Sequence, residues 1–276
     1  MRCSRRSLLR AALGGTAVAG VVAADGVFVT PLGLEVTRHR LGAPDPRSTD
    51  ADEPLGRVVR VAQVSDLHLA AIGAREQALL AALDDLAPDM VVVTGDAIDA
   101  RAGIGPLGEF LAACPTAASR LAILGNWEYK AGVADDGLRG LYERHGFDLL
   151  VNRTTMVRLA GRDVRVTGLD DLCHGRPDAA AALRGAEPTG AHLLLAHCPA
   201  TRDSLRLPDG HAASALLAGH THGGQIAPGG LCLVTPPGSG RYVAGWYDDG
   251  VLPMFVSRGI GTSLVPVRLG ARPELA

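Results

Sequence analysis

The chain has 276 residues, 47% hydrophobic and only 4% aromatic, so it can bury a substantial core built mainly from alanine, valine and leucine. Its formal net charge is −2, and the short basic stretch at residues 158–165 fits a solvated hairpin, which argues against a nucleic-acid binder. The 35 glycines and 17 prolines follow no repeating period, which excludes a fibrous chain.

The first 24 residues are typical of an export signal. Arg5 and Arg6 precede an uncharged, mostly apolar run from Ala11 to Ala24, and the pattern SRRSLLR at residues 4–10 is that of a twin-arginine signal. The run is short for a bilayer span. We expect a signal peptide at 1–24, read by the twin-arginine export machinery and leading to an extracytoplasmic location. If it is not cleaved, the segment to about residue 30 stays as an anchor, the only membrane contact expected.

Removal of residues 1–24 would delete four arginines and no acidic residue, which moves the formal net charge from −2 to −6. Four cysteines remain in that case, and their spacing does not resemble a zinc ribbon. They can form zero, one or two disulfides, and the sequence does not give the pairing.

The remaining chain, residues 33–276, is expected to be one domain. Residues 33–40 alternate as an edge strand does, and residues 43–56, rich in Pro, Asp and Gly, predict an exposed loop. An amphipathic helix is predicted at 74–89, ending at Pro88. Strands are predicted at 57–65, 90–94, 121–124, 192–196 and 214–219, and hairpins at 156–168 and 242–257. Parallel units combined with hairpins indicate a layered α/β protein with a mixed sheet.

Metal-binding residue types follow five of the predicted strands. In chain order they are Asp66 and His68, Asp96, Asn126, His197, and finally His220 and His222. Residues just beyond the carboxyl ends of such strands meet in one crevice. An aspartate after a strand is by itself more often a helix cap than a ligand. The complete set of nitrogen and oxygen ligands is instead what two adjacent divalent ions require.

These motifs, Asp66-x-His68, Gly95-Asp96, Gly125-Asn126, His197 and Gly219-His220-Thr221-His222, resemble those of the calcineurin-like metallophosphoesterase superfamily. Together with the export signal, GHTHGGQ and TGLDDLCHGRPD look most like the secreted YkuE or YaeI type of phosphodiesterase. The resemblance implies two mixed β-sheets flanked by helices.

The resemblance also implies a binuclear site. One metal would be held by Asp66, His68 and His222, and the other by Asn126, His197 and His220, with Asp96 bridging. The ions would be manganese, iron or zinc, all of which tolerate such ligands. A metal-bridging hydroxide would then attack the phosphorus of a phosphodiester or phosphomonoester substrate, with Asp66, Asp96 and Asn126 as catalytic ligands.

One position departs from the family pattern. The superfamily usually places a histidine after the strand-end asparagine, and this chain has Trp127, whose indole N–H cannot shuttle a proton. His174, in the Gly- and Pro-containing loop that follows a predicted strand, is a candidate replacement acid; its alternative interpretation is an exposed loop residue. The function expected is an exported, metal-dependent phosphoesterase. The alternative is a non-catalytic metal-binding or scaffold protein on the same fold.

Overall fold

The computed structural model describes residues 25–41, 58–117, 119–250 and 252–276. The predicted signal peptide and the predicted loop at 43–56 lie outside the described residues. Within those residues, no helix combines the length and the apolar character needed to cross a bilayer.

The first sheet is four-stranded and entirely parallel. Its order is β2 (Val61–Val64), β3 (Met90–Thr94), β4 (Ser119–Ile123) and β5 (Asp148–Leu149). All five residues of β3, MVVVT, are buried, as expected for a parallel strand covered on both faces.

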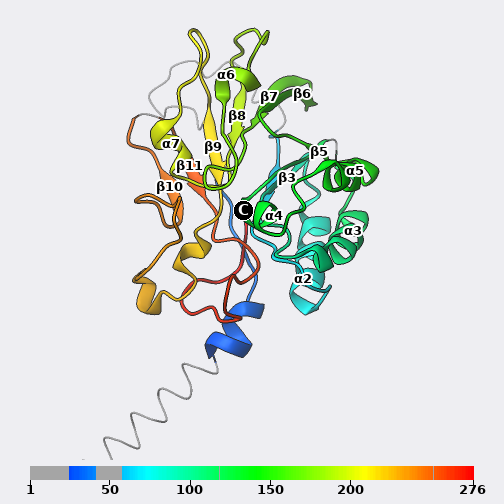
Figure 1. Cartoon of the computed structure of the whole chain (residues 1–276), viewed down its shortest axis with the longest axis vertical. Coiled ribbons are helices and arrows are strands. Elements are labelled where there is room, and N and C mark those ends of the chain that lie inside the picture. Colours follow the sequence, from blue (N-terminus) through cyan, green and yellow to red (C-terminus); the bar gives the residue numbers. More distant parts are fainter. Residues whose placement is uncertain (1–24, 42–57, 118, 251) are drawn as a thin grey trace, which may run out of the picture.

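Helices cover the outer face of this sheet. They are α2 (Ala74–Leu86), α3 (Ile104–Ala113), with the short helix η3 (Arg101–Gly103) before it, and α5 (Asp136–Arg144) (Figure 1). Helix α2 ends where the sequence predicts, because Ala87 adopts a left-handed conformation directly before Pro88. Leu79, Leu83 and Phe110 pack beneath the sheet against Val91 and Val93 of β3.

The second sheet is six-stranded and mixed. Its order is β10 (Gly245–Tyr247), β11 (Met254–Val256), β9 (Ala215–Ala218), β8 (His192–Leu195), β7 (Arg162–Gly168) and β6 (Arg153–Leu159). The four central strands are parallel, and the two predicted hairpins form its antiparallel edges. The short helices α6 (Ala179–Ala182) and α7 (Thr201–Ser204) lie on its outer face.

The main core lies between the two sheets. Met90 and Val92 of β3 point into it, with Leu121 and Ile123 of β4, and they meet side chains of the second sheet, namely Val166, Leu193, Leu195, Leu217 and Phe255. Successive residues of β3 therefore serve two different cores, which is the period-two alternation of a strand. The predicted fold class, two sheets flanked by helices, is confirmed, with the difference that one sheet is purely parallel.

Shorter elements complete the fold. The edge strand predicted at 33–40 is reduced to β1 (Glu35–Val36), which pairs in parallel with β12 (Glu274–Leu275). Before it come η1 (Asp25–Val29) and η2 (Thr30–Leu32). Helix α4 (Asn126–Lys130) follows β4, η4 (His222–Gly224) follows β9, and η5 (Pro228–Gly230) lies in the next loop.

Candidate metal centre

The seven predicted ligands converge at the carboxyl ends of five strands. Those from the four-stranded sheet follow β2, β3 and β4, and those from the six-stranded sheet follow β8 and β9. All seven are buried, none being more than 6% exposed; they are Asp66, His68, Asp96, Asn126, His197, His220 and His222. The two sheets therefore contribute to one site along the seam between them.

The ligands form two groups whose ligand atoms lie close enough to hold an ion. In the first, the Nε2 atoms of His68 and His222 are 3.0 Å apart, and His222 Nε2 is 3.5 Å from Asp66 Oδ1. In the second, His197 Nε2 is 3.1 Å from both Asp96 Oδ2 and His220 Nδ1.

Asn126 and Asp96 complete this arrangement. Asn126 Oδ1 lies 3.2 Å from His197 Nε2, so the amide belongs with the second group. Asp96 Oδ2 is 3.8 Å from His68 Nε2 in the first group and 3.1 Å from His197 Nε2 in the second. One carboxylate thus stands between the two groups, where a bridging ligand has to be.

In three of the histidines, the ring nitrogen that faces away from the cluster contacts a hydrogen-bond acceptor. His197 Nδ1 contacts the Thr94 carbonyl oxygen at 2.8 Å and His220 Nε2 contacts that of Pro237 at 2.7 Å, while Asp99 contacts His68 Nδ1. Each of these three rings therefore donates outward, and its second nitrogen faces the cluster, the usual orientation of ligating histidines.

His222 is the exception. Nη2 of Arg268 lies 3.1 Å from His222 Nδ1, and since a guanidinium can only donate, the His222 proton is on Nε2, facing His68. A cation bound at Nε2 would have to displace that proton. Burial lowers the pKa of Arg268 to about 9.

The charge balance inside the site is dominated by one pair. Burial opposes ionisation of both groups, yet Asp96 and His197 together hold the pKa of His197 well above its ordinary value and that of Asp96 well below. Burial and the neighbouring His68 lower the pKa of His222. Burial also lowers the pKa of His220, so neutral His220 and His222 lie near ionised Asp96. A cation bound at His197 would have to displace a proton, as at His222.

Five of the seven ligands have a strained backbone. Their φ angles are positive although none is glycine; the residues are Asp66 (52°), His68 (48°), Asp96 (51°), His220 (73°) and His222 (53°). Such conformations cost on the order of 1–3 kcal/mol each and cluster at functional sites. This clustering supports a ligand-binding role for the whole set.

At two positions, steric crowding explains why the residue before a predicted ligand is glycine. A Cβ on Gly125 would lie 2.3 Å from Asp96 Oδ1, and one on Gly219 would lie 1.9 Å from the Ser65 hydroxyl, which donates to Asp66. Only glycine lets these turns approach the carboxylates so closely.

Trp127 lies at the first group. Its backbone N–H donates to Asp96 Oδ1 at 2.8 Å, and its ring stands edge-on to that of His68, with centroids 6.2 Å apart. Lys130 Nζ lies 4.5 Å from the centroid of the indole ring. At this position the chain therefore combines a backbone contact to the central carboxylate with a large indole ring, where the family pattern usually has an imidazole.

Glu128, the next residue, organises the turns around the site. Its carboxylate accepts from three backbone N–H groups, those of Asp96 (3.2 Å), Ala97 (2.6 Å) and Gly125 (2.9 Å). Burial and the nearby Asp96 raise the pKa of Glu128 to about 7.

His174 is not brought into the cluster. Its side chain is 39% exposed and its Nδ1 lies 3.8 Å from Asp171, whose carboxylate also accepts from the His174 backbone N–H. Among the described residues, no hydrogen bond or ion pair joins its ring to a predicted ligand. Its role as an acid stays a prediction, while Asp170 and Asp171 order the loop through contacts with Tyr129 O–H and Cys173 N–H.

Sequence reasoning missed two positioning residues. Asp99 contacts the outward-facing Nδ1 of His68. It lies only three residues after Asp96, and this spacing could have identified it from the sequence. Arg268 holds His222 from the far end of the chain, where no local motif marks it. The four described cysteines are free thiols, although the sulfurs of Cys173 and Cys198 are only 3.6 Å apart.

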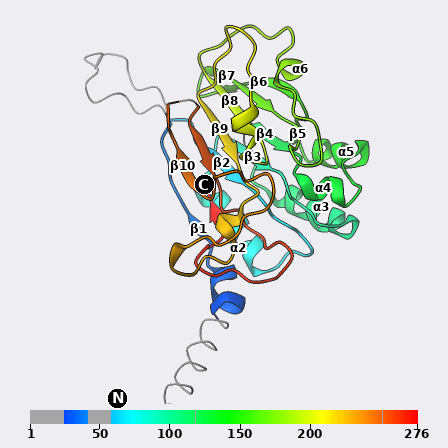
Figure 2. The ribbon, with the colours of Figure 1, turned by 60° about the vertical axis from the view of Figure 1, so that its left-hand side comes forward.

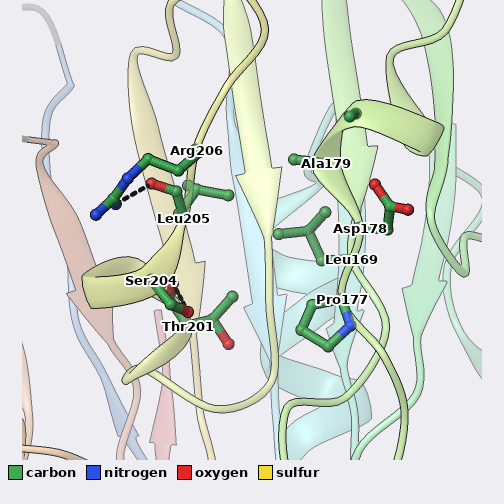
Figure 3. Close-up of a pocket in the computed structure, with 9 residues that line it drawn as sticks. Leu169, Pro177, Asp178, Ala179, Thr201, Ser204, Leu205 and Arg206 are labelled. Atoms are coloured by element: carbon green, nitrogen blue, oxygen red, sulfur yellow. Dashed lines mark hydrogen bonds between the residues drawn. The ribbon is translucent and has the colours of Figure 1, made fainter.

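A separate pocket of about 210 Å³ lies between α6 and α7. Leu169, Thr201 and Leu205 line it, with Asp178 and Arg206 at its edges (Figure 3). No predicted ligand takes part in it, so it is distinct from the metal-binding groups.

Known proteins place the chain in a family. A family model described as calcineurin-like phosphoesterase matches residues 59–224. The chain is 29% identical to the uncharacterized metallophosphoesterase YkuE of Bacillus subtilis (strain 168), over 99% of this chain and 96% of that protein. It is 28% identical to the phosphodiesterase YaeI of Escherichia coli (strain K12), over 90% and 88% respectively. The chain therefore belongs to the calcineurin-like phosphoesterase family.

Proposed function

We propose that this protein is an exported, binuclear-metal phosphoesterase that hydrolyses phosphodiester or phosphomonoester bonds. The observation that carries the proposal is the position of Asp96 between two complete groups of buried ligands. The relative YaeI is named a phosphodiesterase, which favours diesters as the substrate class.

The cations would be held as the family resemblance implies. Asp66, His68 and His222 would hold one, Asn126, His197 and His220 the other, and Asp96 would bridge. When bound, two such cations supply charge neutralisation at phosphorus and a water of lowered pKa. Manganese, iron and zinc all suit this donor set.

Three features of the chain's own residues affect the proposed chemistry. Asp99 and the carbonyls of Thr94 and Pro237 fix the histidine rings, so little reorganisation is needed when cations bind. Burial of all seven ligands keeps bulk water away from them. Trp127 offers only a hydrogen bond from its N–H, so a departing oxygen cannot take a proton from it.

A non-catalytic, metal-binding scaffold is the second candidate. The observation in its favour is Trp127 in place of the usual histidine. The complete ligand set and its strained backbone weigh against it, because a scaffold does not require either.

Metal analysis together with an assay on bis-p-nitrophenyl phosphate separates the two candidates. We expect two ions per chain and metal-dependent hydrolysis. Asp96→Asn should lower activity by more than about 100-fold and reduce the metal content to one ion or none, since the central carboxylate balances charge at both positions. Asp163→Asn, in an exposed ion pair on the β6–β7 hairpin, is the matched control. Two bound ions without any hydrolysis would favour the scaffold.

We further propose export by the twin-arginine route. Arg5→Lys combined with Arg6→Lys should leave folded protein in the cytoplasm, because the receptor reads the arginine pair rather than charge alone. Unchanged export of the double variant would show that another route is used.

A further inference from the structure

One end of the molecule exposes many apolar side chains. Residues 26–34, 223–240 and 259–267 contain no Asp, Glu, Lys or Arg, although 20% of the chain is charged. These three segments, here called the apolar end, hold most of the large exposed hydrophobic residues in the part of the chain that the structure describes: Val27, Val29, Leu32, Ile226, Leu231, Leu233, Val234, Leu264 and Val265.

Hydrogen bonds join the first two segments to the third or to residues 268 and 269, which directly follow it. The Gln225 side chain donates to the carbonyls of Ser263 and Val265, and Ala227 N–H donates to the Leu269 carbonyl. Arg268 N–H donates to the Gly26 carbonyl. Figures 1 and 2 show the segments together at the lower end of the molecule, around η1 and η2.

Leu264 is the clearest sign that this exposure has a purpose. It is 89% exposed and has a φ of 62°, a left-handed conformation that disfavours residues with a Cβ. Glycine or asparagine would fit this position with less strain and no exposed apolar surface. The protein thus holds a largely exposed leucine in a backbone conformation that costs free energy.

We infer that the apolar end docks on a lipid bilayer. The argument for this occupant is the preceding chain: when residues 1–24 are retained as an anchor, their uncharged run at 11–24 leads through Asp25 directly into the η1 residues of this end. Since the three segments have no charge, they suit insertion among lipids rather than attraction to an anionic or basic partner. This extends the expected membrane contact beyond the N-terminal segment and does not depend on the proposed activity.

Docking would bring the metal-binding groups close to the membrane surface. Ile226 is four residues from His222, so their Cα atoms are at most about 14 Å apart. The 259–267 segment also begins at the site, where Gly261 N–H donates to the Asp66 carbonyl at 2.6 Å. One of the two loops therefore follows the predicted ligand His222, and the other contacts the backbone of the predicted ligand Asp66.

A fluorescent reporter on the full chain tests the inference independently of residues 1–24. Leu233→Cys would be labelled with an environment-sensitive fluorophore in a background with Cys3→Ser, Cys173→Ser and Cys232→Ser, which leaves only buried thiols. Phosphatidylcholine vesicles should shift its emission to shorter wavelength. A probe at Met156→Cys, exposed on the edge strand β6, should not respond.

Substitutions then show whether the apolar side chains cause the contact. Leu231→Glu with Leu264→Glu should remove about nine-tenths of the response, a tenfold loss that corresponds to about 1.4 kcal/mol. Val58→Glu with Met156→Glu, two exposed apolar positions elsewhere, should leave it unchanged. Leu264→Asn should weaken the response and slightly raise the unfolding temperature, which separates docking from a structural role.

Three results would overturn the inference. In the first, vesicles do not change the emission of the Leu233 probe, even if the protein co-floats with the vesicles in a density gradient. Residues 1–24 alone would then attach the protein to the membrane. In the second, the emission is already blue-shifted without vesicles and the shift grows with protein concentration, which indicates that a second copy of the chain binds this face. The third is a blue shift independent of both vesicles and concentration, which indicates that residues 1–24 cover the face.

Discussion

Trp127 makes proton delivery the open question of the proposed chemistry. If nothing replaces the missing histidine, the rate should depend steeply on leaving-group pKa, and activated aryl diesters should be cut far faster than alkyl diesters. General acid help is typically worth 10²–10⁴-fold. Trp127→His should therefore accelerate hydrolysis of an alkyl diester selectively, provided that the pocket accepts the smaller ring.

His174→Ala, assayed on the same two substrates, tests the other possibility. If His174 is the acid, its loss should slow the alkyl substrate selectively. Its exposed ring has no hydrogen bond or ion pair to a predicted ligand among the described residues, which favours small, equal changes. If neither variant alters leaving-group selectivity, Trp127 serves packing or substrate stacking, and water delivers the proton.

Arg268 is a second residue whose role can be isolated. It is fully buried and donates to the carbonyls of Gly261 (2.7 Å), Ala271 (3.0 Å) and Arg258 (3.0 Å) besides contacting His222. Arg268→Met would leave these buried acceptors without donors, and we expect the free energy of unfolding to fall by about 3–5 kcal/mol in urea titrations.

The matched control is Arg272→Met, an exposed arginine in the same segment, which should change stability by less than about 0.5 kcal/mol. A loss below about 1 kcal/mol for Arg268→Met would mean that water replaces the guanidinium at these carbonyls.

For single residues, the sequence predicted which side chains come together at the candidate site, but not the contacts that orient them. The ligands are marked by their position after apolar strands, so Asp66 or His197 can be found from the pattern. Arg268 reaches His222 across 46 residues, and the left-handed conformation of five ligands depends on tertiary contacts such as Asp66 with the His220 N–H. No local pattern encodes either feature.

Helix α4 links two strand ends through Glu128. Because the folded chain raises the pKa of this acid from 4.5 to about 7, the native state binds a proton there that the unfolded state releases. The metal-free protein should therefore lose stability relative to Glu128→Gln as pH rises from about 4.5 to 7, by on the order of 1–3 kcal/mol.

Chemical denaturation of both metal-free proteins at several pH values measures this difference. Glu109→Gln, exposed on α3, should track the native chain at every pH. A difference that grows with pH in favour of the native chain would show that the three N–H donors, rather than burial and Asp96, dominate the ionisation of Glu128.

Elements with strong local signals were predicted closely, and weak ones were not. The bounds of β3 and α2 in the structure are close to those predicted, because the hydrophobic pattern and the flanking turn residues indicate the same bounds. The strand predicted at 33–40 shrinks to two residues, since the strand it pairs with among the described residues is the short β12 at the other end of the chain. Pairing across such a separation does not show in local alternation.

Across the whole molecule, the two sheets meet in an apolar core and again at the metal-binding groups. Strands alternating with helices predicted the layered class, but the face-to-face packing of two sheets came from the family resemblance rather than from periodicity. Asp66, His68, Asp96 and Asn126 come from one sheet and His197, His220 and His222 from the other. Bound ions would therefore cross-link the sheets.

If the proposed cations bind, this geometry predicts that metal content will determine part of the global stability. A cation that binds only the folded chain adds about 2.7 kcal/mol at 100 times its Kd, which for a chain of this size raises Tm by roughly 5–11 °C. Chelator-treated protein should lose that increment and regain it on addition of manganese or zinc. The increment should shrink in Asp96→Asn and persist in Asp163→Asn. Because large chains often unfold irreversibly, hydrogen exchange at β3 and β8 provides an equilibrium check, with protection expected to fall in both sheets together. If protection fell only around one ligand group while the other sheet stayed unchanged, the ions would not bridge the two sheets, and the position of Asp96 between the groups would have no stabilising consequence.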